Sequence, residues 1–157
     1  MAGYSGTPLA RKLGIREDCR LFHAGAPSNY LELLAPLPSG VRVVRRVDGT
    51  TDIIHLFATR RARLAAALRS ALEKMRPDAA IWVSWPKKSA RIETDITEDV
   101  VRDVALPMGL VDIKVCAVDD TWSGLKLVLR KERRGAAAGP DARSPRAPAR
   151  SPTKKAC

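Results

Sequence analysis

The feature that most constrains the fold is a nearly continuous apolar run at residues 79–85, which follows directly on a helical pattern. An uninterrupted apolar run of this length is typical of a strand buried on both faces, as in a parallel sheet. In the preceding segment, Leu64, Leu68 and Met75 belong to one apolar stripe with spacings of three and four residues, which predicts an amphipathic helix. A buried strand beside a helix indicates a sheet covered by helices.

The rest of the chain repeats this alternation. Further strands are predicted at residues 21–24, 41–44, 52–57, 111–118 and 122–129. The helix with the apolar stripe is predicted to begin after a cap at Thr59, and two further helices are predicted after an N-cap at Ser28 and after a capping box of Asp95 and Glu98. The alternating leucines at 125, 127 and 129 suit an edge strand.

The order β-α-β-β-α-β-α-β-β predicts an α/β fold. We expect a three-layer, Rossmann-like arrangement with a mostly parallel sheet, because strands that alternate with helices connect by right-handed crossovers. The last two strands are joined by a short turn, which predicts a C-terminal antiparallel hairpin at one edge. This order resembles the class I methyltransferase form of the Rossmann-like fold.

The composition changes sharply after Arg134, which predicts a single α/β domain over 1–134 and a tail over 135–157. The tail contains seven Ala, four Pro and no Leu, Ile, Val or aromatic residue, so it has nothing to bury and we expect it to be disordered. It carries one acidic residue and five basic ones, Arg143, Arg146, Arg150, Lys154 and Lys155. The whole chain has a formal net charge of +11, which favours nucleic acid, phosphates or an acidic protein as a partner.

Several classes of protein are excluded by what the chain lacks. No apolar stretch approaches the ~20 residues that span a membrane, and the first residues have no signal-peptide pattern. The chain has only three widely spaced cysteines and two histidines, which are too few and too scattered for a zinc site. We therefore expect no bound metal. The cysteine usage fits a reducing compartment, and we expect a cytoplasmic protein with no membrane partner.

Three stretches of the sequence resemble a family of small bacterial proteins that is described only as a domain of unknown function. The first is GYSGTPLA with KLGI at residues 3–15, and the second is WPKK at 85–88. The third is LVD, KVCAVD and TWSGL within 110–125. The likeness covers roughly residues 3–133 and implies one compact domain, but it implies no activity.

The candidate site follows from the predicted topology, because ligands of open α/β sheets bind outside the carboxyl ends of the strands. After the first predicted strand come Gly25 and Pro27, and after the fourth come Trp85 and Lys87. Asp119 and Trp122 follow the fifth. Together these six residues offer indoles for stacking and an ammonium for an anion, so we predict a ligand site. The alternatives are structural: Trp85 and Trp122 would cover the sheet edge, Lys87 would be a solvated turn, and Asp119 would shape a turn.

Local chemistry does not match a nucleotide-type cofactor, and we expect none. An adenosyl or dinucleotide cofactor needs a Gly-rich turn after the first strand, and here Gly25 is followed by Ala26 and Pro27. Arg45 and Arg46 stand where a ribose-binding acid is expected. His23, His55 and Trp82 lie inside apolar runs and are predicted to be core residues rather than catalytic ones.

Three functions of different classes remain open at this point. The first is a non-enzymatic binding or regulatory domain, on a methyltransferase-like scaffold without its cofactor site, for a small anionic ligand or a protein. The second is a nucleic-acid-associated protein, in which the basic body and the Ser-Pro-basic motifs of the tail contact DNA or RNA; the tail then either binds nucleic acid or only increases solubility. The third is a small enzyme of unknown reaction. No nucleophile–base pair is evident, so the sequence favours the first.

Overall fold

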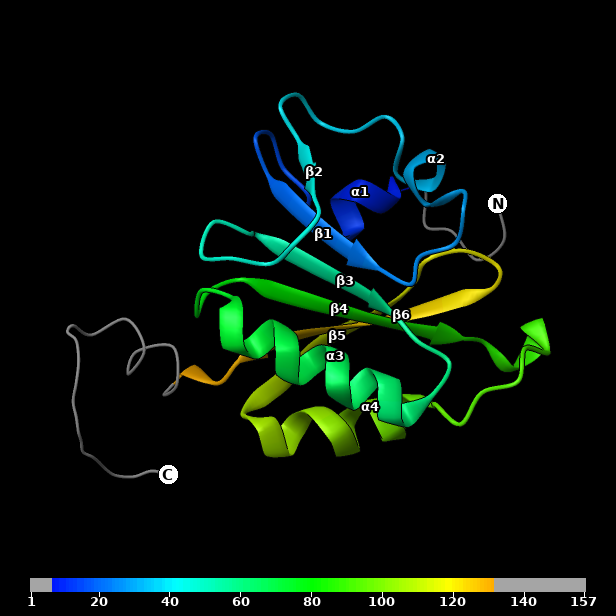
Figure 1. Ribbon diagram of the computed structural model, residues 1–157. Coiled ribbons are helices and arrows are strands. Elements are labelled where there is room, and N and C mark those ends of the chain that lie inside the picture. The colour runs from blue at the N-terminus through cyan, green and yellow to red at the C-terminus, as the bar shows by residue number, and fades with distance from the viewer. Residues whose placement is uncertain (1–6, 132–157) are drawn as a thin grey trace, which may run out of the picture.

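The computed structural model describes residues 7–131 and consists of one six-stranded sheet with helices on both faces (Figure 1). The strand order is β2-β1-β3-β4-β6-β5. The strand bounds are β1 Arg20–Ala24, β2 Arg42–Val44, β3 Ile53–Phe57, β4 Ala80–Pro86, β5 Leu110–Ala117 and β6 Trp122–Leu129. The predicted α/β class, the mostly parallel sheet and the C-terminal hairpin are therefore confirmed.

The hairpin differs from the expectation in which strand forms the edge. β6 pairs antiparallel with both β4 and β5, so it lies inside the sheet and β5 is the edge strand. Because β6 is reversed relative to both neighbours, β5 runs in the same direction as β1 to β4. The alternation at Leu125, Leu127 and Leu129 comes from a different cause: Leu125 and Leu127 are fully buried in the core beneath the helices. The prediction of an edge strand there was wrong.

The helices divide between the two faces of the sheet. The α-helices are α1 Leu9–Lys12, α2 Tyr30–Leu34, α3 Arg61–Lys74 and α4 Glu98–Ala105, and the 3-10 turns are η1 Lys88–Ala90 and η2 Leu106–Met108. One buried cluster joins α1 and α2 to one face, and it includes Trp82. The other joins α3 and α4 to the opposite face, and it includes Ile81 and Val83. Alternating residues of β4 thus enter different cores, which explains why its apolar run is continuous.

The helix caps differ from the sequence prediction. α2 begins after Asn29 and α3 after Arg60, rather than after Ser28 and Thr59. Asp95 does not cap its own helix: its Oδ1 accepts the backbone amide of Arg61, 2.7 Å away, and so caps α3. α4 is capped by Thr97, whose Oγ1 accepts the amide of Val100. The spacing of Asp95 and Glu98 was compatible with a capping box, but the chain brings Asp95 to another helix.

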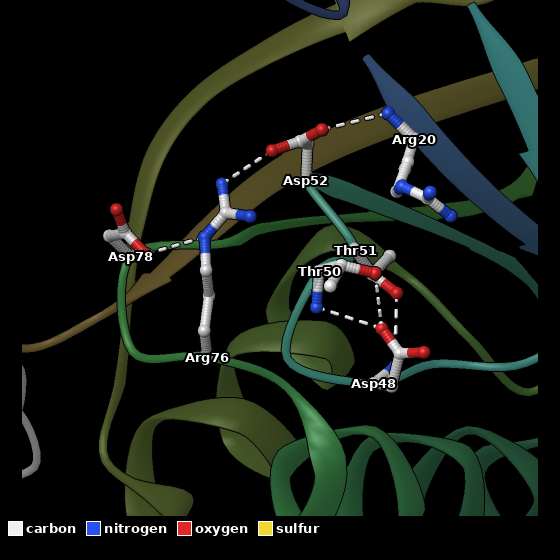
Figure 2. A network of polar contacts seen from close by, with 7 residues as sticks. All are labelled: Arg20, Asp48, Thr50, Thr51, Asp52, Arg76 and Asp78. Atoms are coloured by element: carbon white, nitrogen blue, oxygen red, sulfur yellow. Dashed lines mark hydrogen bonds and ion pairs between the residues drawn. The ribbon is translucent and has the colours of Figure 1, made fainter. Parts of the chain in front are cut away.

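The amino-terminal ends of the strands are tied by a polar network (Figure 2). Asp52 accepts the backbone amide of Arg20 at 2.7 Å and the Nη2 of Arg76 at 2.6 Å. Arg76 also donates its Nε to Asp78 at 2.7 Å. Asp48 closes the neighbouring turn, because its Oδ1 accepts the backbone amide and the hydroxyl of Thr50. The network joins the segments that precede β1, β3 and β4, at the end of the sheet opposite to the candidate site.

Candidate functional site

A chain of aromatic rings fills the α1–α2 side of the sheet near the carboxyl ends of the strands. The Tyr30 hydroxyl lies 2.8 Å from Nδ1 of His55, and Nε2 of His55 lies 2.8 Å from Oγ of Ser84. Phe57 stacks on His55 with a ring separation of 4.3 Å and meets Trp122 edge-on at 5.1 Å. Burial lowers the pKa of His55 to about 3 and raises that of Tyr30. Both histidine nitrogens are hydrogen-bonded in the core, so His55 is a structural residue.

Gly25 is required by packing between β1 and β3. Its φ is +73°, and a methyl group on its α-carbon would lie 2.5 Å from the carbonyl oxygen of Phe57. The space that the missing side chain leaves is therefore occupied by the backbone of β3. Pro27 accepts the backbone amide of Tyr30 and so begins α2. These contacts give both predicted site residues a structural role at the end of β1.

Trp85 and Trp122 lie at the same end of the sheet but on opposite faces. In the antiparallel register Trp85 pairs with Ser123 and Trp122 pairs with Pro86. The two indoles therefore stand one position apart in the register, and successive positions point to opposite faces. Trp85 joins the α3–α4 core, whereas Trp122 packs against the α1–α2 core. They do not line one pocket together, contrary to the expectation that all strand ends would contribute to one site.

Asp119 shapes the turn between β5 and β6. Its Oδ1 accepts the backbone amides of Thr121 and Trp122, each at 2.8 Å, which is the local bonding that makes Asp common in turns. Lys87 is linked to the same turn through its backbone amide, which donates to the Thr121 carbonyl at 2.8 Å. Among the described residues no ion pair joins the Lys87 side chain to Asp119, so the turn leaves that ammonium free for another partner.

A cleft of about 820 Å³ opens at the carboxyl end of β4, on the α4 side of the sheet. Two predicted site residues, Trp85 and Lys87, line it, and the other four do not. Its remaining walls are Pro86, Lys88, Ile92, Thr94, Ile96, Thr97, Glu98, Asp99 and Ser123. The volume lies in the range of small-molecule sites, about 300–1,000 Å³. The cleft is thus the part of the predicted edge that has room for a ligand.

Charge is arranged unevenly within this cleft. Lys87 is half-buried and Lys88 is exposed on the β4 side, and within the described residues neither forms an ion pair. On the opposite wall Glu98 pairs with Arg102, and Asp99 lies 3.4 Å from the same guanidinium. The carboxylates are therefore partly neutralised and the ammonium groups are not. The α4 wall could not be predicted from the sequence, because the spacing of Asp95 and Glu98 indicated a capping box instead.

Other predicted contacts fall outside this region. The candidate nucleic-acid residues of the tail, Arg143, Arg146, Arg150, Lys154 and Lys155, lie outside the described residues. Within residues 7–131, no three His, Cys, Asp or Glu side chains gather in a way that could hold a metal ion. None of the helices in that range combines the length and apolar character that crossing a bilayer requires.

Comparisons with known proteins support the fold. A SAM-dependent methyltransferase from Aquifex aeolicus aligns with a TM-score of 0.52 and 15% identity, over 77% of this chain and 87% of that one. The DhpI–SAH complex aligns with a TM-score of 0.54 and 11% identity, over 78% of this chain and 82% of the other. Aeropyrum pernix fibrillarin, solved with bound S-adenosyl-L-methionine, gives a TM-score of 0.50 and 14% identity, over 80% and 70% of the two chains.

These likenesses establish a methyltransferase-like, Rossmann-type fold. No family model and no curated sequence matches the chain, so the resemblance of its motifs to a bacterial family of unknown function stays a prediction. The residues here differ from what an adenosyl cofactor requires. The β1–α2 loop holds one glycine where a Gly-rich turn is expected, and two arginines follow β2 where an acid would bind ribose.

Proposed function

We propose that this protein is a non-enzymatic, ligand-binding domain on a methyltransferase-like scaffold. In this proposal the cleft at the end of β4 binds a small ligand with an anionic group, and no methyl group is transferred. The observation that carries the proposal is the cleft at the end of β4, in which Lys87 and Lys88 form no ion pair with a described residue. The turn after β1 holds a single glycine, Gly25, and does not line this cleft.

The chemistry of the cleft favours a ligand with an anionic group. Lys87 and Lys88 provide two ammonium groups that pair with no carboxylate of residues 7–131, and Ser123 adds a hydroxyl from β6. Trp85 is only 6% exposed, so it contributes an apolar floor rather than a stacking surface. A phosphate or carboxylate beside the lysines would replace solvent at two ammonium groups that have no ion-pair partner in the described part of the chain. The carboxylates of Glu98 and Asp99 on the opposite wall would disfavour a ligand with negative charge at both ends.

Native mass spectrometry of the full chain, purified from its own host, is the experiment that identifies the ligand. We expect a copurifying small molecule that bears a phosphate or a carboxylate. Its binding should quench Trp85 fluorescence, and the double variant Lys87→Gln/Lys88→Gln should weaken its binding at least tenfold. Lys114→Gln, which removes an exposed ammonium from β5, is the matched control and should leave binding unchanged.

Calorimetry with S-adenosylmethionine tests the other half of the proposal. We expect no heat of binding for the full chain at micromolar to millimolar cofactor. Micromolar binding would overturn the proposed loss of the cofactor site. A ligand that copurifies but binds equally well to the double lysine variant would instead move the binding site away from the cleft.

A further inference from the structure

Among the described residues, no helix covers β1 and β2 on the α3 side of the sheet. On this face α3 packs against β3 and α4 packs against β5 and β6, whereas β1 and β2 extend beyond both helices (Figure 1). The chain passes from β2 to β3 through residues 45–52 without a helix, and Val47 from this connection packs into the α3–α4 core. Residues 45–52 therefore border the uncovered part of this sheet face. A hollow remains between these residues and α3.

The hollow is an apolar groove of about 270 Å³, separate from the cleft at β4. Phe22 of β1 and Leu56 of β3 line its sheet side. Ala67 and Ala71 line its helix side, and their short side chains leave the space open. The groove is slightly smaller than a typical drug-sized site of roughly 300 Å³ or more. It has room for one aromatic ring system, but not for a nucleotide.

Three cations surround this groove. Arg45 and Arg46 follow β2, and Lys74 ends α3; all three are exposed and line the groove. None of them forms an ion pair with a described residue, although Asp48 lies near enough to Arg46 for the two charges to interact. An apolar floor beneath unpaired guanidinium groups is complementary to a molecule with an apolar body and one anionic group. A carboxylate matches the planar fork of an arginine and loses less hydration than a phosphate dianion on entering an apolar groove.

We propose that the groove between β1, β3 and α3 is a second binding site, specific for a small aromatic carboxylate. The ring packs between Phe22 and Ala71, and the carboxylate accepts hydrogen bonds from Arg45 and Arg46. Lys74 adds a positive charge at the other wall. This site does not depend on the proposed function of the cleft, because the two share no lining residue.

Titration of the full chain with 2-naphthoate, followed by amide NMR shifts, tests this site. We expect the amides of Phe22, Arg46 and Ala71 to shift, and the affinity to exceed that for 2-naphthalenemethanol, the neutral analogue, at least tenfold. Arg45→Gln/Arg46→Gln should weaken 2-naphthoate binding at least fivefold. Arg69→Gln removes an equally exposed charge from α3 outside the groove and should have no effect.

A groove-filling variant supplies an independent test. Ala71→Phe should abolish binding, and if that variant does not fold, Ala67→Leu at a half-buried position should still weaken it. Equal affinities for the acid and the alcohol, or an equal loss in Arg69→Gln, would overturn the proposal. So would tighter binding of 2-naphthyl phosphate, since the groove would then select phosphate. Retention of 2-naphthoate binding in the Lys87→Gln/Lys88→Gln variant would distinguish this groove from the cleft.

Discussion

The hydroxyl of Tyr30 and the Nδ1 of His55 lie 2.8 Å apart in the core between α2 and β3. The pair joins a helix to the middle of the sheet. The hydroxyl of Ser84 is hydrogen-bonded to the other ring nitrogen of His55. A neutral imidazole has one donor and one acceptor nitrogen, and these two hydroxyls can satisfy both, while complete burial disfavours the charged form of the ring. The arrangement makes His55 a source of stability that depends on pH.

The free energy of unfolding is expected to decrease as the pH falls below about 7. Burial, with a smaller effect from His23, lowers the pKa of His55 to about 3 in the folded protein, whereas an unfolded histidine titrates near 6.5. The unfolded state therefore takes up the proton first, and stability is lost as the pH falls from about 6.5 towards about 3. Between pH 7.5 and 5.0 the free energy of unfolding should decrease by about 2 kcal/mol in urea titrations.

His55→Gln is the variant that checks the assignment. It should remove most of this pH dependence, whereas His23→Gln should remove little of it, because His23 is only partly buried. The same pH dependence in both variants would show that another group is responsible.

Tyr30→Phe tests the hydrogen bond itself. The change keeps the ring but leaves a buried histidine nitrogen without a partner, which costs roughly 1–3 kcal/mol of unfolding free energy. Urea unfolding at pH 7.5 measures this loss, and the double variant with His55→Leu gives the coupling energy. If Tyr30→Phe costs as much in the His55→Leu background, the hydroxyl stabilises the protein through some other contact.

Gly25→Ala should destabilise the protein by about 2–4 kcal/mol. The new methyl group would lie 2.5 Å from the Phe57 carbonyl oxygen, in a backbone conformation that favours glycine. Gly49→Ala is the matched control, since a methyl group there meets nothing within 4 Å. Thermal unfolding of both variants decides the matter: a tolerated Gly25→Ala would mean that the end of β1 can open.

Asp95→Ala should cost about 1 kcal/mol, the usual effect of losing a helix cap. Its carboxylate accepts the amide of Arg61 at 2.7 Å, although the two residues are 34 positions apart. Glu93→Gln, in the same loop, serves as the control because Glu93 is exposed and pairs only loosely with Arg60. Circular dichroism melting curves compare the two, and an equal loss would point to the loop rather than to the cap.

Asp52→Asn tests the network at the opposite end of the sheet. Partial burial raises the pKa of Asp52, but the amide of Arg20 and the guanidinium of Arg76 outweigh it, so the net shift is downward. A lowered pKa stabilises the fold above the unfolded value of about 3.9, and this contribution is lost as the pH falls below that value. The wild type should therefore lose stability between pH 4 and 2 more steeply than Asp52→Asn.

The order and type of the major elements could be predicted from the sequence because they depend on local pattern. The apolar run of β4 and the helical stripe of Leu64 and Leu68 are visible without any partner strand. α1 was missed, because a helix of four residues is too short to show a period. The role of α1 depends on a contact with the distant strand β4. The indole nitrogen of Trp82 donates a hydrogen bond to the carbonyl of Leu13, just after α1, at 3.0 Å.

The candidate site depended more on tertiary structure. The sequence by itself placed Trp85, Lys87 and Trp122 at one end of the sheet, since the carboxyl ends of parallel strands share an edge. Only the pairing of β4 with β6 decided which face each indole takes, because a shift of one residue in register reverses every side chain. That register joins strands far apart in the chain, as does the capping of α3 by Asp95. Local pattern therefore determined the scaffold, and long-range pairing determined where the scaffold leaves room for a ligand.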